Sequence, residues 1–180
     1  MNRIVKQILL AGVFVLAYVG IRYLYFLPRY GSGDRVPEIS ATLSTGQHFE
    51  LSQLRDHYVL LDFWGSWCGP CIRDQPEMKA LYAKYHTANF EAADGLEIVS
   101  IAIENDTQRW RRALEILKPV SPYQILDTTT SLRFFNGKIS EQFGVNRLPM
   151  KFLINGEGKV VGANWSLAEI AEYLNAHLKA

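Results

Sequence analysis

A chain of 180 residues with 48% apolar residues is long enough for one well-buried globular domain plus an appendage. Its formal net charge of +1, without a basic block, argues against nucleic acid as a partner. Two cysteines are too few for a disulfide-stapled fold or a cysteine-rich zinc site, and the four histidines are scattered without ligand spacing. We therefore expect no metal.

The first segment of the chain is apolar. Residues 8–21 carry no charge, and only Arg22 interrupts the apolar character before residue 27. The 20 residues of 8–27 are about what a helix needs to cross ~30 Å of hydrocarbon, and two basic residues precede them. We predict a cytoplasmic n-region over 1–7 and an uncleaved transmembrane signal anchor over 8–27. The short uncharged run also suits a cleaved signal peptide, but no convincing small-x-small cleavage site is present.

Residues 28–35 contain the sequence Gly-Ser-Gly-Asp, which is typical of a linker. An N-terminal segment of this design normally exports the residues that come after it. We therefore expect residues 36–180 to lie outside the cytoplasm, on the periplasmic or cell-surface side of a membrane. Positive charges flank the apolar segment on both sides, so charge alone does not settle the orientation.

From residue 36 onward, strand-like and helix-like stretches alternate, which predicts an α/β sheet covered by helices. The expected strands, of which the first two form a hairpin, are 38–43, 47–50, 58–64, 96–103, 123–126, 150–154 and 159–162. The expected helices are 70–88, 107–117, most of 132–143 with a break near Asn136-Gly137, and 167–178. Pro76 predicts a kink in the first of these helices. Ser166 with Glu169 three residues later predicts a capping box at the start of the last.

The two cysteines are the most informative residues of the chain. Cys68 and Cys71 flank Gly69-Pro70 and lie between an apolar strand and a helical pattern. Two thiols separated by two residues can close on each other, and a helix N-terminus stabilises a thiolate. The segment therefore predicts a redox dithiol. We expect Cys68 on the helix's first turn at a partly exposed rim, where it attacks a partner's disulfide, and Cys71 resolves the mixed disulfide.

Two distant motifs resemble the thioredoxin superfamily. Residues 62–71, DFWGSWCGPC, resemble a thioredoxin active site, and residues 143–149, FGVNRLP, resemble the cis-proline segment. The hairpin, the extra strand and helix within 96–125 and the apolar anchor resemble the membrane-anchored thiol-disulfide oxidoreductases of the TlpA/ResA type. The resemblance covers residues 36–180. It implies a thioredoxin fold, a mixed central sheet flanked by helices, with an N-terminal β-hairpin extension.

The resemblance implies a role for two acidic residues. Asp62 is a carboxylate inside an apolar run, and burying it is costly unless it is protonated or hydrogen-bonded. It matches the thioredoxin aspartate that moves a proton to and from the resolving cysteine, although residues 96–103 lack the lysine that thioredoxins carry in the neighbouring strand. Asp74 stands where ResA-like proteins have a glutamate near the active site, and a solvated acid on the helix face is the alternative interpretation.

The resemblance also implies where substrates bind. Trp67, Gly69 and Pro70 surround the attacking cysteine. Pro149 would be cis, and the backbone of Leu148 would pair with an extended substrate strand. Leu148 departs from the family, since TlpA-type proteins usually have a threonine there, so we expect it to remove a hydrogen-bonding contact to substrate.

The Gly-Pro dipeptide between the cysteines predicts the direction of the reaction. It is the pair found in thioredoxin, whose potential is about −270 mV, whereas that of DsbA is about −120 mV. We therefore predict a reductant of protein disulfides that needs no bound cofactor. The family implies a transmembrane electron donor of the CcdA or DsbD type, and targets such as the haem-site disulfide of apocytochrome c.

Three alternatives remain open at this point. A peroxiredoxin-like peroxidase shares the hairpin and the fold, but it needs Pro-x-x-x-Thr-x-x-Cys, and residues 63–66 lack that proline. An SCO-like copper chaperone uses cysteines three residues apart with a distal histidine, whereas the spacing here is two. A non-enzymatic adaptor with a vestigial site is disfavoured by the intact Cys-Gly-Pro-Cys.

Overall fold

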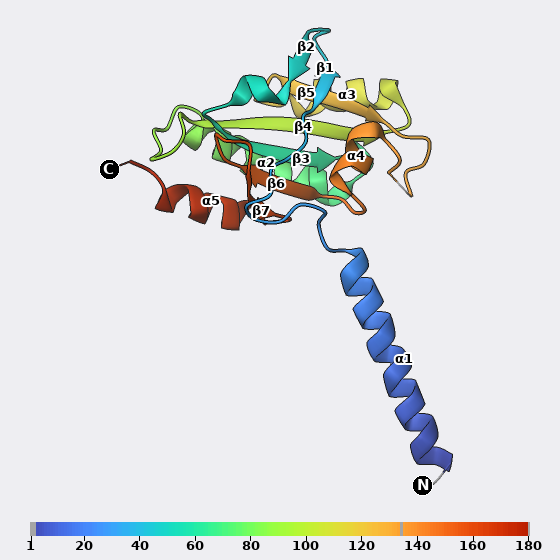
Figure 1. Ribbon diagram of the computed structural model, residues 1–180. Helices are drawn as coiled ribbons and strands as arrows, with labels where there is room; N and C mark the ends of the chain where they lie inside the picture. Colours follow the sequence, from blue (N-terminus) through green and yellow to red (C-terminus); the bar gives the residue numbers. More distant parts are fainter. Residues whose placement is uncertain (1–2, 134, 180) are drawn as a thin grey trace.

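The computed structural model describes residues 3–133 and 135–179, which form one long helix and a layered α/β domain (Figure 1). In chain order the elements are α1 (Arg3–Tyr25), β1 (Ser40–Thr42), β2 (His48–Glu50), the 3-10 helix η1 (Leu51–Leu54), β3 (Tyr58–Trp64), α2 (Gly69–Tyr85), β4 (Leu96–Glu104), α3 (Thr107–Leu117), β5 (Tyr123–Thr128), α4 (Lys138–Phe143), β6 (Met150–Ile154), β7 (Val160–Ala163) and α5 (Leu167–Ala176).

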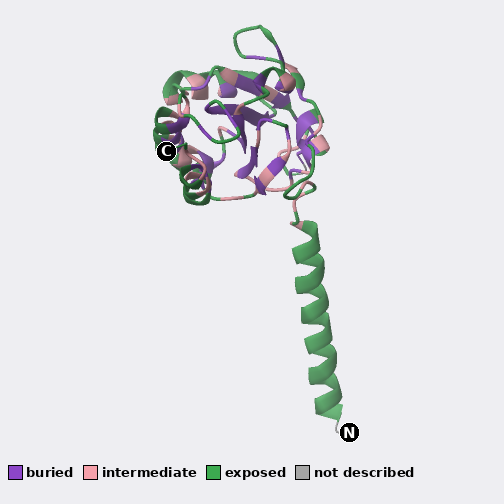
Figure 2. Ribbon diagram, turned by 60° about the vertical axis from the view of Figure 1, so that its left-hand side comes forward, coloured by how far each residue is buried: buried purple, intermediate pink, exposed green. Residues whose placement is uncertain are grey.

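Helix α1 extends away from the domain. Its 23 residues span about 34 Å at a rise of about 1.5 Å per residue, and none of them is buried in the protein (Figure 2). By length and composition it can cross a membrane, so the apolar helix indicates membrane attachment. The side on which the domain lies stays a prediction, as do the boundaries 1–7, 8–27 and 28–35.

The segment predicted as a linker is hydrogen-bonded to the domain. Arg29 Nη1 donates to the carbonyl of Glu141 at 2.7 Å. Gly33 N donates to Val160 O and Val160 N donates to Asp34 O, each at 2.8 Å, so the segment pairs with β7.

The end of α1 is also attached to the domain. The amide of Asn146 donates to the carbonyl of Tyr25, the last residue of the helix. The guanidinium of Arg147 lies over the ring of Phe26, 5.4 Å from its centroid. The end of the apolar helix therefore contacts the loop that leads to Pro149.

The central sheet is mixed, with the strand order β5-β4-β3-β6-β7. Strands β3, β4 and β5 are parallel, whereas β6 is antiparallel to both β3 and β7. All residues of β3, β4 and β6 are buried, because elements cover both faces of the sheet. The hairpin β1-β2 forms a separate two-stranded sheet, and Leu43 just after β1 bridges to Ile125 on the outer edge of β5.

Alternate residues of β3 separate two cores. Val59, Leu61 and Phe63 point to the face covered by the hairpin, η1 and α4. Tyr58 and Leu60 point to the opposite face, where α2 and α5 pack. A third, smaller cluster on this second face contains both cysteines and joins α2 to α3. The redox segment therefore belongs to the core of the α2 face.

Among the described residues of the helix predicted over most of 132–143, only the six residues of α4 are helical. Helix α4 begins directly after the break predicted near Asn136-Gly137, and the helical part before that break was predicted wrongly. Two side chains impose the later start. The buried carboxylate of Asp127 accepts hydrogen bonds from the backbone of Ile139 and Ser140, at 3.1 and 2.7 Å. The side chain of Asn136 accepts from the backbone of Thr130, which holds the preceding residues in a turn.

Among the other predicted elements, β3, α3 and β6 have the predicted bounds, and the rest are found with shifted ends. The helices α2 and α5 are shorter than predicted at their C-termini, and β4 and β5 are longer. Asp106 caps α3 by accepting from the backbone of Gln108 and Arg109, and the capping box of Ser166 and Glu169 is confirmed.

Two aspartates accept hydrogen bonds from the first turn of a helix: the buried Asp127 from α4, and the exposed Asp106 from α3. Asp127→Ala leaves two buried backbone N–H groups without an acceptor, and we expect it to lower the free energy of unfolding by about 2–4 kcal/mol. The exposed cap Asp106→Ala should cost only about 1 kcal/mol. Urea unfolding of the oxidised protein measures both, and equal losses would contradict the structural role assigned to Asp127.

Candidate active site

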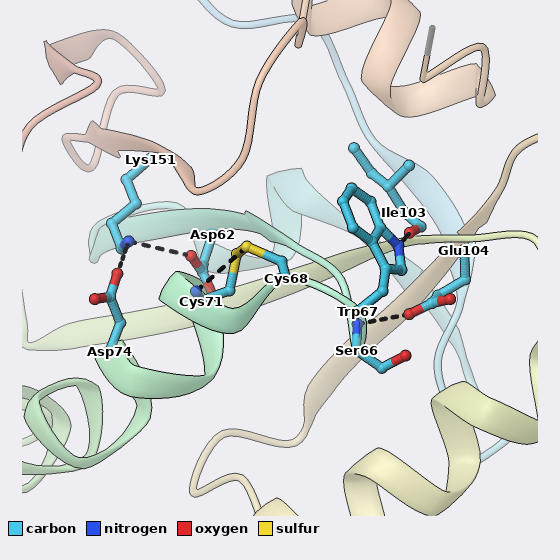
Figure 3. Close-up of a disulfide and its surroundings, with 9 residues drawn as sticks. All are labelled: Asp62, Ser66, Trp67, Cys68, Cys71, Asp74, Ile103, Glu104 and Lys151. Atoms are coloured by element: carbon cyan, nitrogen blue, oxygen red, sulfur yellow. Dashed lines mark hydrogen bonds and ion pairs between the residues drawn. A yellow bond between two sulfur atoms is a disulfide. The ribbon is translucent and has the colours of Figure 1, made fainter. Parts of the chain in front are cut away.

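Cys68 and Cys71 are joined by a disulfide with an S–S distance of 2.07 Å (Figure 3). Cys68 is the N-cap residue of α2, and its sulfur accepts a hydrogen bond from the backbone N–H of Cys71 at 3.3 Å. The expectation that Cys68 lies on the first turn is therefore wrong by one residue. Pro70 stands in that first turn, where a helix has no intrahelical partner for a backbone N–H, so its missing hydrogen costs nothing.

Both sulfur-bearing residues are buried. Cys68 is 5% exposed and Cys71 is 2% exposed, so the prediction of a partly exposed rim for Cys68 is wrong, although Cys68 is the more exposed of the two. The reason is packing that the local sequence does not show. Trp64 and Trp110 join the cysteines in one apolar cluster, and Leu148 packs against it from the loop before β6.

The loop between β3 and α2 places Trp67 beside the disulfide. The indole Nε1 of Trp67 donates to the carbonyl of Ile103 at 3.0 Å. Trp67 is nevertheless 37% exposed to solvent. A Cβ on Gly65 would lie only 2.7 Å from that indole nitrogen, so only glycine fits there. The predicted substrate residue Trp67 thus has a fixed orientation.

A buried carboxylate, Glu104 at the end of β4, supports this loop and was missed by the sequence analysis. Its side chain is not exposed, and it accepts from the backbone of Ser66 at 2.6 Å (Figure 3). It also accepts from Arg109 of α3 at 2.8 Å. The available signal was an acid that ends a long apolar run and is followed five residues later by an arginine. The predicted strand stopped one residue before it.

The acid Asp62 lies on the face of β3 that carries the disulfide, because it alternates with the same set as Leu60 and Trp64. It is 2% exposed and stands directly opposite Lys151 of β6 in the antiparallel register.

The Lys151 ammonium lies 3.8 Å from a carboxylate oxygen of Asp62. The same ammonium donates to the Asp74 carboxylate at 2.6 Å, and Figure 3 shows it between the two acids.

Lys151 was also missed. The resemblance to thioredoxin places a lysine in the strand on one side of Asp62, residues 96–103, whereas the structure supplies one from β6 on the other side. A signal was present, since Lys151 is the one charged residue of the run 150–154. Its partner could not be read from the sequence, because that needs the register between β3 and β6.

The environment of Asp62 changes its acidity. The pKa of the Asp62 carboxyl is raised from 3.8 to about 6, and burial is the largest cause. The Lys151 ammonium lowers this pKa, and the Asp74 carboxylate raises it, each by less than burial does. A carboxyl group with a pKa near 6 can both accept and release a proton close to neutral pH.

The peptide between Leu148 and Pro149 is cis, as the resemblance implies. Leu148 and Pro149 are both partly exposed, and Leu148 packs against the disulfide cluster. Pro149 lies at a cleft of about 420 Å³ between α2 and the start of α5, which Asp74 and Lys151 also line. This cleft reaches the buried lysine from the surface.

Residues 31–165 match the Redoxin family. The chain belongs to the Redoxin family. Thiol-disulfide oxidoreductase ResA of Bacillus cereus is 34% identical over 131 residues, which cover 72% of this chain and 66% of that protein. ResA of Bacillus subtilis is 30% identical over 132 residues, covering 72% of this chain and 64% of that protein. The matches thus span slightly less than two thirds of these relatives.

Solved structures confirm the fold. The thioredoxin domain of a thiol-disulfide oxidoreductase from Bacteroides vulgatus superposes with a TM-score of 0.66 at 21% identity, covering 80% of this chain and 98% of that one. A putative thiol:disulfide interchange protein DsbE from Chlorobium tepidum gives a TM-score of 0.64 at 27% identity, covering 82% and 94%. This Redoxin chain therefore has the predicted thioredoxin-like fold, with a five-stranded mixed sheet and an N-terminal hairpin.

The structure brings most of the predicted site residues of this Redoxin chain together. The redox segment, the Leu148-Pro149 turn and Asp62 meet on the α2 side of the sheet. Asp74 reaches this group through Lys151, so it is not a free acid on the helix face. The catalytic and substrate-binding roles of all these residues stay predictions.

The raised pKa of Asp62 predicts how stability depends on pH. Because the folded-state value of about 6 lies above the ordinary value of 3.8, the carboxyl destabilises the fold as pH rises from about 4 through 6. Asp62→Asn removes this cost. Relative to the wild type, the variant should therefore gain about 3 kcal/mol of stability between pH 4 and pH 7.

Urea unfolding of the oxidised proteins at pH 4 to 8 measures this difference. The exposed variant Asp94→Asn serves as the control and should stay within about 0.5 kcal/mol of the wild type. A stability difference between Asp62→Asn and wild type that does not change with pH would refute the assigned environment.

Proposed function

We propose that this Redoxin-family protein is a thiol-disulfide oxidoreductase that acts on protein disulfides through Cys68 and Cys71. The observation that carries the proposal is the disulfide at the N-cap of α2, with the sulfur of Cys68 hydrogen-bonded to the backbone N–H of Cys71. The relatives at 30% and 34% identity are named thiol-disulfide oxidoreductases, which agrees with it.

The reduced form supplies the nucleophile. The N-terminus of α2 and the N–H of Cys71 both favour negative charge on the sulfur of Cys68. The Cys68 thiolate attacks one sulfur of a partner's disulfide. That S–S bond breaks, the other partner sulfur leaves as a thiolate, and a mixed disulfide joins Cys68 to the partner.

The second step restores the disulfide seen in the structure. Cys71 gives up its proton and attacks the sulfur of Cys68, so the mixed disulfide breaks and the partner's second sulfur leaves. Asp62 is the proton acceptor for Cys71 in this proposal, because it is buried on the same face and has a pKa of about 6. The partner gains two electrons and the cysteine pair loses two.

The protein partner is bound in an extended conformation in this proposal. Trp67 is exposed next to Cys68 in the chain, and Leu148, which precedes the cis Pro149, packs against the disulfide cluster and is partly exposed. Gly69 has no side chain, so it leaves the start of the helix open to a partner. In this proposal an extended substrate segment pairs with the backbone of Leu148.

In this proposal the protein acts as a reductant at the outer face of a membrane. Gly69-Pro70 favours a reductant, with haem-site disulfides of apocytochrome c or other oxidised envelope proteins as substrates. The apolar helix α1 favours a domain held at the outer face of a membrane. A reductant in that place needs a transmembrane donor of the CcdA or DsbD type to return two electrons to the cysteine pair.

Cysteine variants test the reaction. The reduced full chain in detergent should reduce the disulfides of insulin, and Cys68→Ser should lower the rate at least a hundredfold, because it removes the attacking sulfur. Cys71→Ser should instead accumulate a mixed disulfide on Cys68, visible by mass spectrometry. Retention of wild-type activity by Cys68→Ser would defeat the proposal, and rapid peroxide consumption without a protein substrate would favour a peroxidase.

The direction has its own test. Equilibration of the full chain with glutathione buffers should give a potential well below about −180 mV, the value of protein disulfide isomerase. A value at or above that level would show an isomerase or an oxidant and would remove the argument for a transmembrane electron donor.

A further inference from the structure

Lys151 is an unusual residue for its position. It is 4% exposed in β6, and Met150, Phe152, Leu153 and Ile154 around it are all buried and apolar. Placing an ammonium group in such a strand carries a desolvation penalty of several kcal/mol, which apolar packing at the same position avoids. The fold alone therefore does not account for a lysine here.

The contacts of the ammonium are unequal. Its nitrogen lies 2.6 Å from a carboxylate oxygen of Asp74, a charge-assisted hydrogen bond, and 3.8 Å from an oxygen of Asp62, which is beyond hydrogen-bond distance. Asp74 therefore fixes the position of the ammonium. Asp62 lies farther from the ammonium but still feels its charge.

The three groups form a path from the core to the surface. Asp62 is buried, Lys151 is buried but lines the cleft beside Pro149, and the side chain of Asp74 is 31% exposed at the same cleft. The redox cluster borders the inner end of the path, because Trp64 on the same face of β3 packs with both cysteines. A proton that reaches Asp62 thus has a charged, partly solvated route outward.

We propose that Lys151 is a positioning residue that couples Asp62 to Asp74, so that the carboxylate which takes the proton of Cys71 returns it to water through the cleft beside Pro149. The inference rests on the proposed function, in which Asp62 accepts that proton. When it does, Asp62 becomes neutral and the ammonium remains paired with Asp74. When Asp62 releases the proton to water in the cleft, the original charges return.

The charges around the network fix the sign of each effect. The described groups that face it are Asp62 on β3, Lys151 on β6, Asp74 and Glu77 on α2, and Glu169 at the start of α5. Strand β4 places Ser100, which does not titrate at these pH values, opposite Asp62. Lys151 is thus the cation that keeps Asp62 ionised, and Asp74 is an acid that opposes this.

Removal of the two partners should therefore act in opposite directions. Lys151→Met leaves Asp62 beside acids only, so Asp62 should hold its proton to higher pH. Asp74→Asn removes a negative charge and frees the ammonium for Asp62, so Asp62 should lose its proton at lower pH. General damage to the site would slow both variants in the same way.

The experiment follows the two steps separately in the full chain in detergent. The reduced protein reacts with 5,5′-dithiobis(2-nitrobenzoic acid), which releases one coloured thiolate when Cys68 attacks and a second when Cys71 resolves the mixed disulfide. Stopped-flow absorbance between pH 5 and 8 gives both rates. In the wild type, the second rate should rise with pH through a midpoint near 6.

Lys151→Met should raise the pH midpoint of the second rate by at least about one pH unit, which slows the second step about tenfold at pH 5.5. Asp74→Asn should move it down. Lys151→Arg should stay within about threefold of the wild type, and so should the surface control Lys159→Met, whose side chain is 44% exposed. The first step should change little in any of these variants.

A double variant keeps the inference falsifiable. Asp62→Asn should remove the midpoint near 6 and leave only the rise with pH that comes from ionisation of the Cys71 thiol itself, and adding Lys151→Met should then change the second rate no further. The inference would be overturned if the pH midpoint of the second rate were unchanged in Lys151→Met, or if it moved in the same direction in Lys151→Met and Asp74→Asn. The proposed function would survive either result, because both thiolates would still be released. If the wild type never releases the second thiolate, the proposed function fails, and this inference fails with it.

Discussion

Complete burial of β3 is the constraint on which the rest of the domain depends. Every residue of this strand is buried, and its backbone pairs with β4 on one side and β6 on the other. The chain leaves it through a short loop and enters α2 at a cysteine that caps the helix. The capping sulfur, the helix dipole and the apolar cluster around the disulfide all follow from the place where this one strand ends.

The same burial makes charged groups in the core costly, and the structure places them where chemistry is expected. Asp62 and Lys151 face each other across β3 and β6, and Glu104 holds the loop before the disulfide. A buried ion pair is a weak source of stability, because desolvation offsets most of the attraction. These charged groups are therefore better explained by what they do to protons and to the loop than by what they add to the fold.

Much of the fold was predictable because its signals are local. The apolar run 58–64 predicted its strand with the observed boundaries, and the capping box of α5 was identified from the spacing of Ser166 and Glu169. What failed depends on contacts between distant segments. The burial of Cys68 requires Leu148 and Trp110, and the partner of Asp62 requires the register of β6 against β3. Side chains from the Asp127 region decide where α4 begins, which no helical pattern within 132–143 reveals.

The hydrogen bond from Asn146 to the last carbonyl of α1 has a geometric consequence. Pro149 comes three residues after Asn146 in the chain. An extended chain covers at most about 3.5 Å per residue, so Pro149 stays within roughly 10 Å of Asn146, the residue that holds the helix end. Once α1 is embedded in a bilayer, the reactive sulfur has little freedom to swing outward into bulk solution. Thiol-disulfide exchange would then be confined to partner cysteines that lie close to the lipid headgroups. The membrane helix would thus restrict the set of partners by their distance from the bilayer, before any side chain recognises them.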